Sequence, residues 1–158
     1  LLEKHGIEIV GIGGHPEGHP NNTPAQLWDW MERKLAAIRA RGMTPLVVTQ
    51  FAFDDDAIIA WLKEMRARGI DVPVRLGVPG PAGIKRLLGF AKRCGVGASA
   101  NVMKKYGISL TNLIGSAGPD KLVSSLDKGL TPDLAGYGCT FGALTASAEW
   151  INKYDAAH

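Results

Sequence analysis

The sequence has few cysteines and no long hydrophobic run. Its two cysteines, Cys94 and Cys139, lie far apart and share no metal-ligand spacing, which argues against a disulfide framework and against a zinc site. No apolar segment approaches the roughly 18 residues of a membrane span, and no signal-peptide pattern opens the chain. We therefore expect a protein of the reducing cytoplasm without a membrane partner.

An excess of charge of one sign is also lacking. The 158 residues include 18 Lys and Arg against 15 Asp and Glu, a net charge of +3, and the basic residues are scattered rather than striped. This pattern argues against nucleic acid as a partner. The composition, 46% hydrophobic and 21% charged, is ordinary for a globular protein, and the length suffices for one domain.

An initiator methionine is absent as well. The chain begins Leu1-Leu2-Glu3 and runs almost at once into an apolar, β-rich segment. We therefore expect this sequence to be a segment of a longer polypeptide.

Apolar, β-rich runs alternate with segments of helical periodicity along the chain. Predicted strands cover Ile7–Gly13, Thr44–Thr49, Val72–Gly77 and Leu134–Thr140; predicted helices begin at Thr23, Asp54, Pro81 and Leu144, with shorter helical pieces at Ala100–Tyr106 and Asp120–Leu126. This order, with connections of this length, predicts an α/β fold with a parallel sheet.

Four strand-helix units are half of a TIM (β/α)8 barrel, which usually needs about 250 residues. We predict that residues 1–158 form a single domain, the C-terminal half of such a barrel, and that the N-terminal half is absent from this chain. An isolated half would leave two strand edges open. We therefore expect further chain or a partner subunit, a second copy in a homo-oligomer included, to close the barrel.

Two segments, Gly13–Pro20 and Val47–Asp54, break abruptly from an apolar run into polar, glycine and proline residues. Each lies where a predicted strand ends, and the carboxyl ends of parallel barrel strands are where ligands bind. Gly13 and Gly14 lack the spacing of a dinucleotide-binding loop, and Pro16 blocks an immediate helix start. Close approach of a flat ligand to the backbone explains these two glycines better.

The segments Pro16-Glu17-Gly18-His19-Pro20 and Thr49-Gln50-Phe51-Ala52-Phe53-Asp54 resemble methylenetetrahydrofolate reductases, whose patterns run Tyr-Pro-Glu-x-His-Pro and Thr-Gln-Phe-x-Phe-Asp. The resemblance implies an oxidoreductase that interconverts 5,10-methylenetetrahydrofolate and 5-methyltetrahydrofolate, with hydride passing from NAD(P)H to FAD and then to folate. The family's general acid, a Glu on an early strand, has no counterpart here. The catalytic acid is therefore expected outside this chain.

The resemblance also implies residues that bind FAD. His15 stands where the family has Tyr, His19 matches the family His that contacts FAD, and a family Lys on the next helix suggests Lys34. Gly13 and Gly14 would let the flavin approach the backbone. Two plainer alternatives stay open: His19 bonds its own loop backbone, and Lys34, which the periodicity places on the apolar face of its helix, only snorkels along that face.

For the folate substrate, the resemblance points to Gln50, because the family Gln of this motif hydrogen-bonds the pterin. A neutral amide both donates and accepts, as a pterin edge requires; the alternative is a Gln that satisfies strand-end backbone. Phe51 and Phe53 alternate around it, so one faces the core and the other stacks on substrate, and we select Phe53. Thr140 matches a family Thr, whereas the family Arg that follows is Ala143 here.

No metal site is expected. Pro16 and Pro20 forbid the helix that would bring the imidazoles of His15 and His19 onto one ion. Helix capping explains the run Asp54–Asp56 with fewer assumptions than a metal cluster does.

Three other functions stay open. His15 in place of Tyr and Ala143 in place of Arg leave room for a flavin-independent reductase with direct hydride transfer. The glycine-rich loops after the last two strands fit a TIM-barrel enzyme with a phosphate-bearing ligand. The non-enzyme alternative is a half-barrel that binds a nucleotide without turnover.

Overall fold

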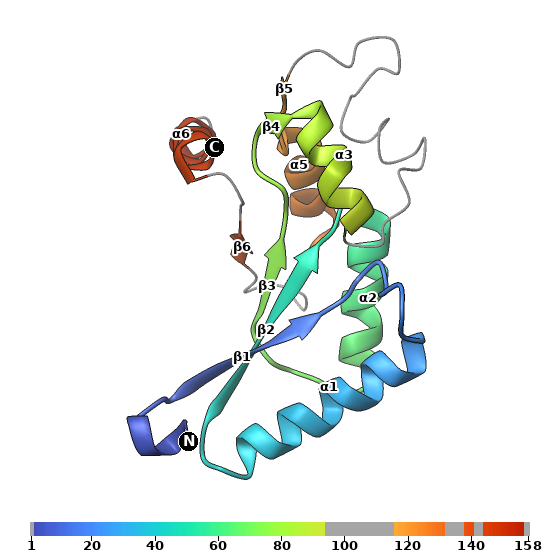
Figure 1. Cartoon of the computed structure of the whole chain (residues 1–158), viewed down its shortest axis with the longest axis vertical. Coiled ribbons are helices and arrows are strands. Elements are labelled where there is room, and N and C mark those ends of the chain that lie inside the picture. The colour runs from blue at the N-terminus through green and yellow to red at the C-terminus, as the bar shows by residue number, and fades with distance from the viewer. Residues whose placement is uncertain (1, 94–115, 132–137, 141–143, 157–158) are drawn as a thin grey trace.

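The computed structural model describes residues 2–93, 116–131, 138–140 and 144–156 (Figure 1). A short 3-10 helix, η1, covers Glu3–His5. The strands are β1 Ile9–Gly14, β2 Thr44–Phe51, β3 Val74–Gly77, β4 Ala82–Gly83, β5 Ser116–Ala117 and β6 Gly138–Thr140. The helices are α1 Pro24–Arg39, α2 Asp55–Ala67, α3 Ile84–Arg93, α5 Asp120–Gly129 and α6 Leu144–Asp155.

The main sheet has four parallel strands in the order β1-β2-β3-β6. The prediction of an α/β fold with a parallel sheet is therefore confirmed, and the strand order is compatible with half of a barrel. The antiparallel pair of β4 and β5 was not predicted, and it delays the helix expected from Pro81 until Ile84. The predicted helical piece at Ala100–Tyr106 lies outside the described residues, as do residues 134–137 of the last predicted strand.

The starts of α1 and α2 follow from local sequence. The Thr23 hydroxyl accepts from the Gln26 N–H at 3.3 Å, and the Gln26 side chain accepts from the Thr23 N–H at 2.9 Å, a complete capping box. Asp54 caps α2 by accepting from the N–H groups of Asp56 and Ala57. Such caps use neighbouring residues only, which is why sequence alone predicts them.

The two faces of the sheet differ. In β2 the buried residues Pro45, Val47 and Thr49 alternate with residues that are exposed or half-buried. The buried face packs against α1 and α2, which lie together on one side of the strands (Figure 1). We call the other side the open face. The largest fully buried side chains include Phe53, Ile58, Leu62, Met65, Leu76, Val47 and Val74.

A β-bulge interrupts β2 just before its carboxyl end. Val48 pairs with Arg75 and Phe51 with Gly77, so β2 has one more residue than β3 between these pairs. The Gly77 N–H donates to the Thr49 hydroxyl at 2.8 Å, and the Ala52 N–H donates to the Gly77 carbonyl at 2.9 Å. A Cβ at Gly77 would lie 2.6 Å from the Thr49 carbonyl oxygen. The bulge therefore requires glycine at this position.

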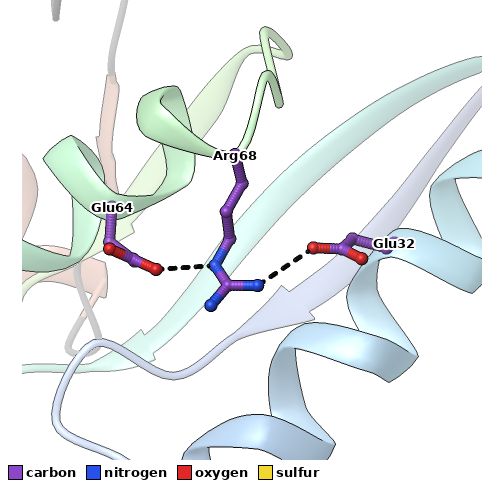
Figure 2. Close-up of polar contacts among 3 residues, drawn as sticks. All are labelled: Glu32, Glu64 and Arg68. Atoms are coloured by element: carbon purple, nitrogen blue, oxygen red, sulfur yellow. Dashed lines mark hydrogen bonds and ion pairs between the residues drawn. The ribbon is translucent and has the colours of Figure 1, made fainter.

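One arginine makes charged hydrogen bonds to both α1 and α2. The Arg68 guanidinium at the end of α2 donates to Glu64 at 2.8 Å and to Glu32 of α1 at 3.3 Å (Figure 2). The same guanidinium lies 4.9 Å from the centre of the Trp28 ring, which stacks on Trp61 at 5.5 Å. Stacking and charge together fix the spacing of the two helices.

Among the described residues, no helix has both the length and the apolar character that crossing a membrane requires.

We predict that Gly77→Ala lowers the free energy of unfolding by about 1–3 kcal/mol, because the methyl group would overlap the Thr49 carbonyl. Chemical denaturation measures this. The matched control is Gly89→Ala within α3, where a Cβ meets nothing within 4 Å and alanine favours the helix by about 0.5–1 kcal/mol. Equal midpoints for the two variants would contradict the tight bulge.

Candidate functional site

The two polar strand ends lie at the same end of the sheet. β1 and β2 run parallel, and Gly14 at the end of β1 pairs with Thr49 near the end of β2. The loops that follow are joined directly, because the Phe53 N–H donates to the Glu17 carboxylate at 3.0 Å. The segments 13–20 and 47–54 therefore form one site at the carboxyl ends of the strands, which we call the strand-end site.

The loop from His15 to Asn22 is folded on itself. The Gly18 N–H donates to the His15 carbonyl at 3.0 Å, and Gly18 has a φ of 85°, which suits glycine. The His19 Nδ1 accepts from the Asn21 N–H at 3.2 Å and lies 2.8 Å from the Asn22 amide nitrogen. His19 thus bonds its own loop backbone, which was the plainer alternative. With Nδ1 accepting, a neutral His19 carries its proton on Nε2, and its contact with FAD stays a prediction.

His15 packs against His19, with the ring centres 5.3 Å apart and the planes at 89°. The pKa of His15 is lowered from its ordinary value of 6.5, first by desolvation in its half-buried position and then by electrostatic interaction with His19 and Lys34. The His15 imidazole is therefore neutral near pH 7, and it is a donor and acceptor rather than a cation.

The two glycines of β1 have different surroundings. A Cβ at Gly13 would meet only the His15 Cε1 at 3.6 Å, so the backbone on the open face is accessible to a flat ligand. Gly14 is buried, and a Cβ there would lie 3.0 Å from the Trp61 indole and 3.0 Å from Val47. The assignment of Gly14 to a ligand is therefore corrected: the Trp61 ring occupies the space that glycine leaves.

The position predicted for Lys34 was wrong in one respect. The buried residues of α1 are Met31, Leu35 and Ile38, whereas Lys34 is exposed. Lys34 lies at the border of this stripe, beside an apolar groove that includes Ile38 and Val10. Its charge is the last of the three causes that lower the pKa of His15, after desolvation and His19. A role in binding cofactor phosphates stays a prediction.

Gln50 is exposed at the end of β2, next to the bulge. Its side-chain oxygen accepts from the Phe51 N–H at 3.2 Å, which is the strand-end backbone contact weighed as the alternative. The amide therefore holds an orientation at the rim of the open face, and its bond to a pterin stays a prediction.

Phe53 is corrected as a substrate-binding side chain. It is 1% exposed and belongs to the core, because the chain turns after β2 to start α2 and directs this ring inward. Phe51 is half-buried and is the better candidate for stacking. Thr140 pairs with Gly77 in β6, which places its backbone at the same strand ends. The Thr140 side chain lies outside what the structure describes.

The run Asp54–Asp56 brings its carboxylates within 4.8 Å of one another. Asp54 caps α2, and Asp55 accepts from the Ser125 hydroxyl of α5. The capping interpretation is confirmed for Asp54. Asp55 holds α5 against the start of α2.

A pocket of about 310 Å³ lies behind the strand-end site, between α1 and α2. The loop residues His15, Pro16 and Gly18 form one wall of this pocket. The remaining lining is Pro24, Leu27, Trp28, Met31, Ala57, Ala60, Trp61 and Glu64.

Sequence reasoning missed three features of the site. Glu17 was read only as part of a motif, although its carboxylate joins the two loops. Trp61 was not connected with Gly14, because no local signal pairs residues so far apart. Arg75 was passed over, although a charge within an apolar strand is a visible signal.

We predict that Glu17→Ala lowers the free energy of unfolding by about 1–3 kcal/mol, because the Phe53 N–H loses its charged acceptor. Glu17→Gln keeps an acceptor and should lose less. Thermal and urea denaturation measure both variants, with Glu8→Ala, an exposed acid before β1, as the control. A Glu17→Ala variant as stable as the control would contradict the joining role of this carboxylate.

We predict that the pKa of His15, followed by the NMR shift of its imidazole, lies below 6.5 and rises towards 6.5 in Lys34→Gln. Because the folded state binds this proton less readily than the unfolded state, the contribution to stability is complete above about pH 6.5 and is lost as pH falls from there to the folded pKa. Lys153→Gln on α6 is the charge control. A pKa of His15 that is equal in wild type and Lys34→Gln would exclude the coupling.

No family model matches the chain. Over 94 residues, 59% of this chain, the sequence is 32% identical to methylenetetrahydrofolate reductase 2 of Saccharomyces cerevisiae, and the match spans 15% of that protein's length. More than half of the chain is thus similar to a protein named methylenetetrahydrofolate reductase. This is the family that the two loop segments resemble.

Proposed function

We propose that the chain is the C-terminal half of a (β/α)8 barrel that interconverts 5,10-methylenetetrahydrofolate and 5-methyltetrahydrofolate with NAD(P)H and FAD. The observation that carries the proposal is the bond between the Phe53 N–H and Glu17, because it brings the two family-like segments to one ligand-binding edge. The similarity to the yeast reductase supports the same conclusion.

The residues of the strand-end site fit a flavin. Gly13 leaves its backbone accessible on the open face, and the neutral His15 presents a ring beside it without adding a charge. In the proposal, Gly13, His15 and His19 hold the cofactor, with Lys34 towards its phosphates. FAD, when bound, supplies the hydride chemistry, and the protein binds and orients both partners.

Gln50 is the proposed pterin ligand. Its side-chain oxygen is held by the Phe51 N–H, so the amide nitrogen has a defined direction from which to donate. Phe51 lies next to it, half-buried, as a surface for stacking. The proton donor of the reaction is expected outside these residues.

Closure of the barrel is part of the proposal. β1 is an edge strand of the main sheet, and Ile9 on it is 61% exposed. Beside β1, Val10, Ile12 and Met43 line an apolar groove of about 330 Å³. A strand-helix unit from an N-terminal half or from a partner subunit would cover both features.

A flavin-independent reductase is the second candidate. Two observations favour it: a histidine, His15, stands where the family has its Tyr, and Ala143 replaces the family Arg. In this case hydride passes directly from NAD(P)H to the folate carbon, and Gln50 keeps its role.

We predict that the purified polypeptide, together with the N-terminal half that is expected to supply the proton donor, shows flavin absorbance and oxidises NAD(P)H when 5,10-methylenetetrahydrofolate is added. In Gln50→Ala, the KM for the folate should rise about tenfold, since one hydrogen bond to the pterin is lost, while the FAD content is unchanged. Asn152→Ala, an exposed amide on α6, is the matched control.

The outcomes separate the candidates. A colourless but active protein would overturn the FAD assignment and establish the flavin-independent reductase. An inactive protein whose melting temperature is raised by a phosphate ester and not by folate would overturn the reductase. If activity appears only after an N-terminal half is added, closure of the barrel is supported.

A further inference from the structure

Arg75 is the one long charged side chain in a row of small residues across the described part of the main sheet. The parallel pairing aligns Gly13, Val48, Arg75 and Gly138 on the four strands. Aligned residues of parallel strands share a face, and in β3 the neighbours Val74 and Leu76 are buried whereas Arg75 is exposed. The guanidinium therefore belongs to the open face.

The glycines clear space around this arginine. Its row has Gly13 at one end and Gly138 as its direct partner in β6, neither of which bears a side chain. Gly77, two residues further along β3, is buried against the backbone of Thr49 and Gln50 and adds no free space. We call this part of the open face, from Gly13 across Val48 and Arg75 to Gly138, the trough. Gln50 lies two residues beyond Val48, about 7 Å further along β2.

An arginine at this position departs from the usual composition of such a face. The interior of a parallel barrel is filled mainly by branched apolar side chains. Arg75 is exposed in this chain, but a guanidinium enclosed by a closed barrel would need a carboxylate or phosphate, which it binds through two parallel hydrogen bonds. Among the described residues, Arg75 makes no ion pair.

We propose that Arg75 binds an oxyanion of the ligand, a carboxylate or a phosphate, in the trough below Gln50. The trough lies one to two residues before the carboxyl ends of β1 and β3, which is where barrel ligands bind. This inference rests on the proposed location of the ligand at the strand ends. It does not depend on the reductase reaction itself.

Calorimetric titration of the complete chain with three probes tests the inference. ADP carries phosphates without a carboxylate, 5-methyltetrahydrofolate carries carboxylates without a phosphate, and riboflavin carries neither. In Arg75→Met, the Kd of the oxyanion-bearing probe should rise about tenfold or more, because a charged hydrogen-bond donor is lost. Riboflavin binding should change less than twofold. If only the affinity for ADP falls, Arg75 binds a phosphate. If only the affinity for the folate falls, Arg75 binds a carboxylate.

Two further variants sharpen the result. Arg75→Lys keeps the charge without the planar fork, so its Kd should fall between those of wild type and Arg75→Met. Arg39→Met on the exposed side of α1 is the matched control and should bind like wild type. Raising the salt concentration should weaken binding of the oxyanion probe to wild type and much less to Arg75→Met.

Three outcomes would overturn the inference: wild type binds none of the probes, the Kd values of ADP and folate in Arg75→Met stay within twofold of wild type, or neither Arg75 variant folds. The last result would make Arg75 a residue that the fold itself requires. Failure of the proposed function is distinguishable: a chain without reductase activity whose ADP binding still depends on Arg75 would retain this site. Conversely, if the chain has reductase activity but Arg75→Met binds ADP and folate as wild type does, the oxyanion site at Arg75 is excluded.

Discussion

The arrangement of the strand-end site depends on the hydrogen bond from the Phe53 N–H to Glu17. The bond spans 36 residues and joins the loop after β1 to the segment that leads into α2. Asp54, the next residue, caps that helix. One carboxylate thus fixes the histidine loop relative to both β2 and the start of α2. A charged acceptor makes this bond stronger than a neutral one, which suits a contact between two irregular segments.

The second constraint is the difference between the two faces of the sheet. Parallel sheets are normally covered on both faces, because their strands come from crossover units. Here α1 and α2 cover one face with a packed core, while the other carries glycines, Val48, Gln50 and Arg75. An apolar core and an open face on the same four strands are what half of a barrel would present, with its ligand side uncovered.

Sequence alone located most elements because their signals are local. The capping box at Thr23, the aspartate cap at Asp54 and the alternation within β2 each lie within a few residues. The errors at Gly14 and Phe53 share another cause. Which ring fills the space above Gly14, and where the Phe53 side chain turns after a bulge, are set by tertiary packing between distant segments. The predicted burial of Lys34 was wrong because this residue lies at the edge of the buried stripe of α1, where a small rotation about the helix axis decides between burial and exposure.

The charged and polar groups near the strand-end site determine which ligand it would suit. Burial and neighbouring positive charge keep the His15 imidazole neutral, so the loop adds hydrogen-bonding groups there rather than a cation. Lys34 lies on the helix side, and Arg75 lies on the open face of β3. The Glu17 carboxylate, the acid of the histidine loop, accepts from the Phe53 backbone N–H. Three further acids follow β2: Asp54 caps α2, Asp55 accepts from Ser125, and Asp56 is exposed. A flat ligand with an anionic group would suit Lys34 and Arg75 better than a neutral ligand does, and its charge would offset the repulsion that, after desolvation, lowers the pKa of His15.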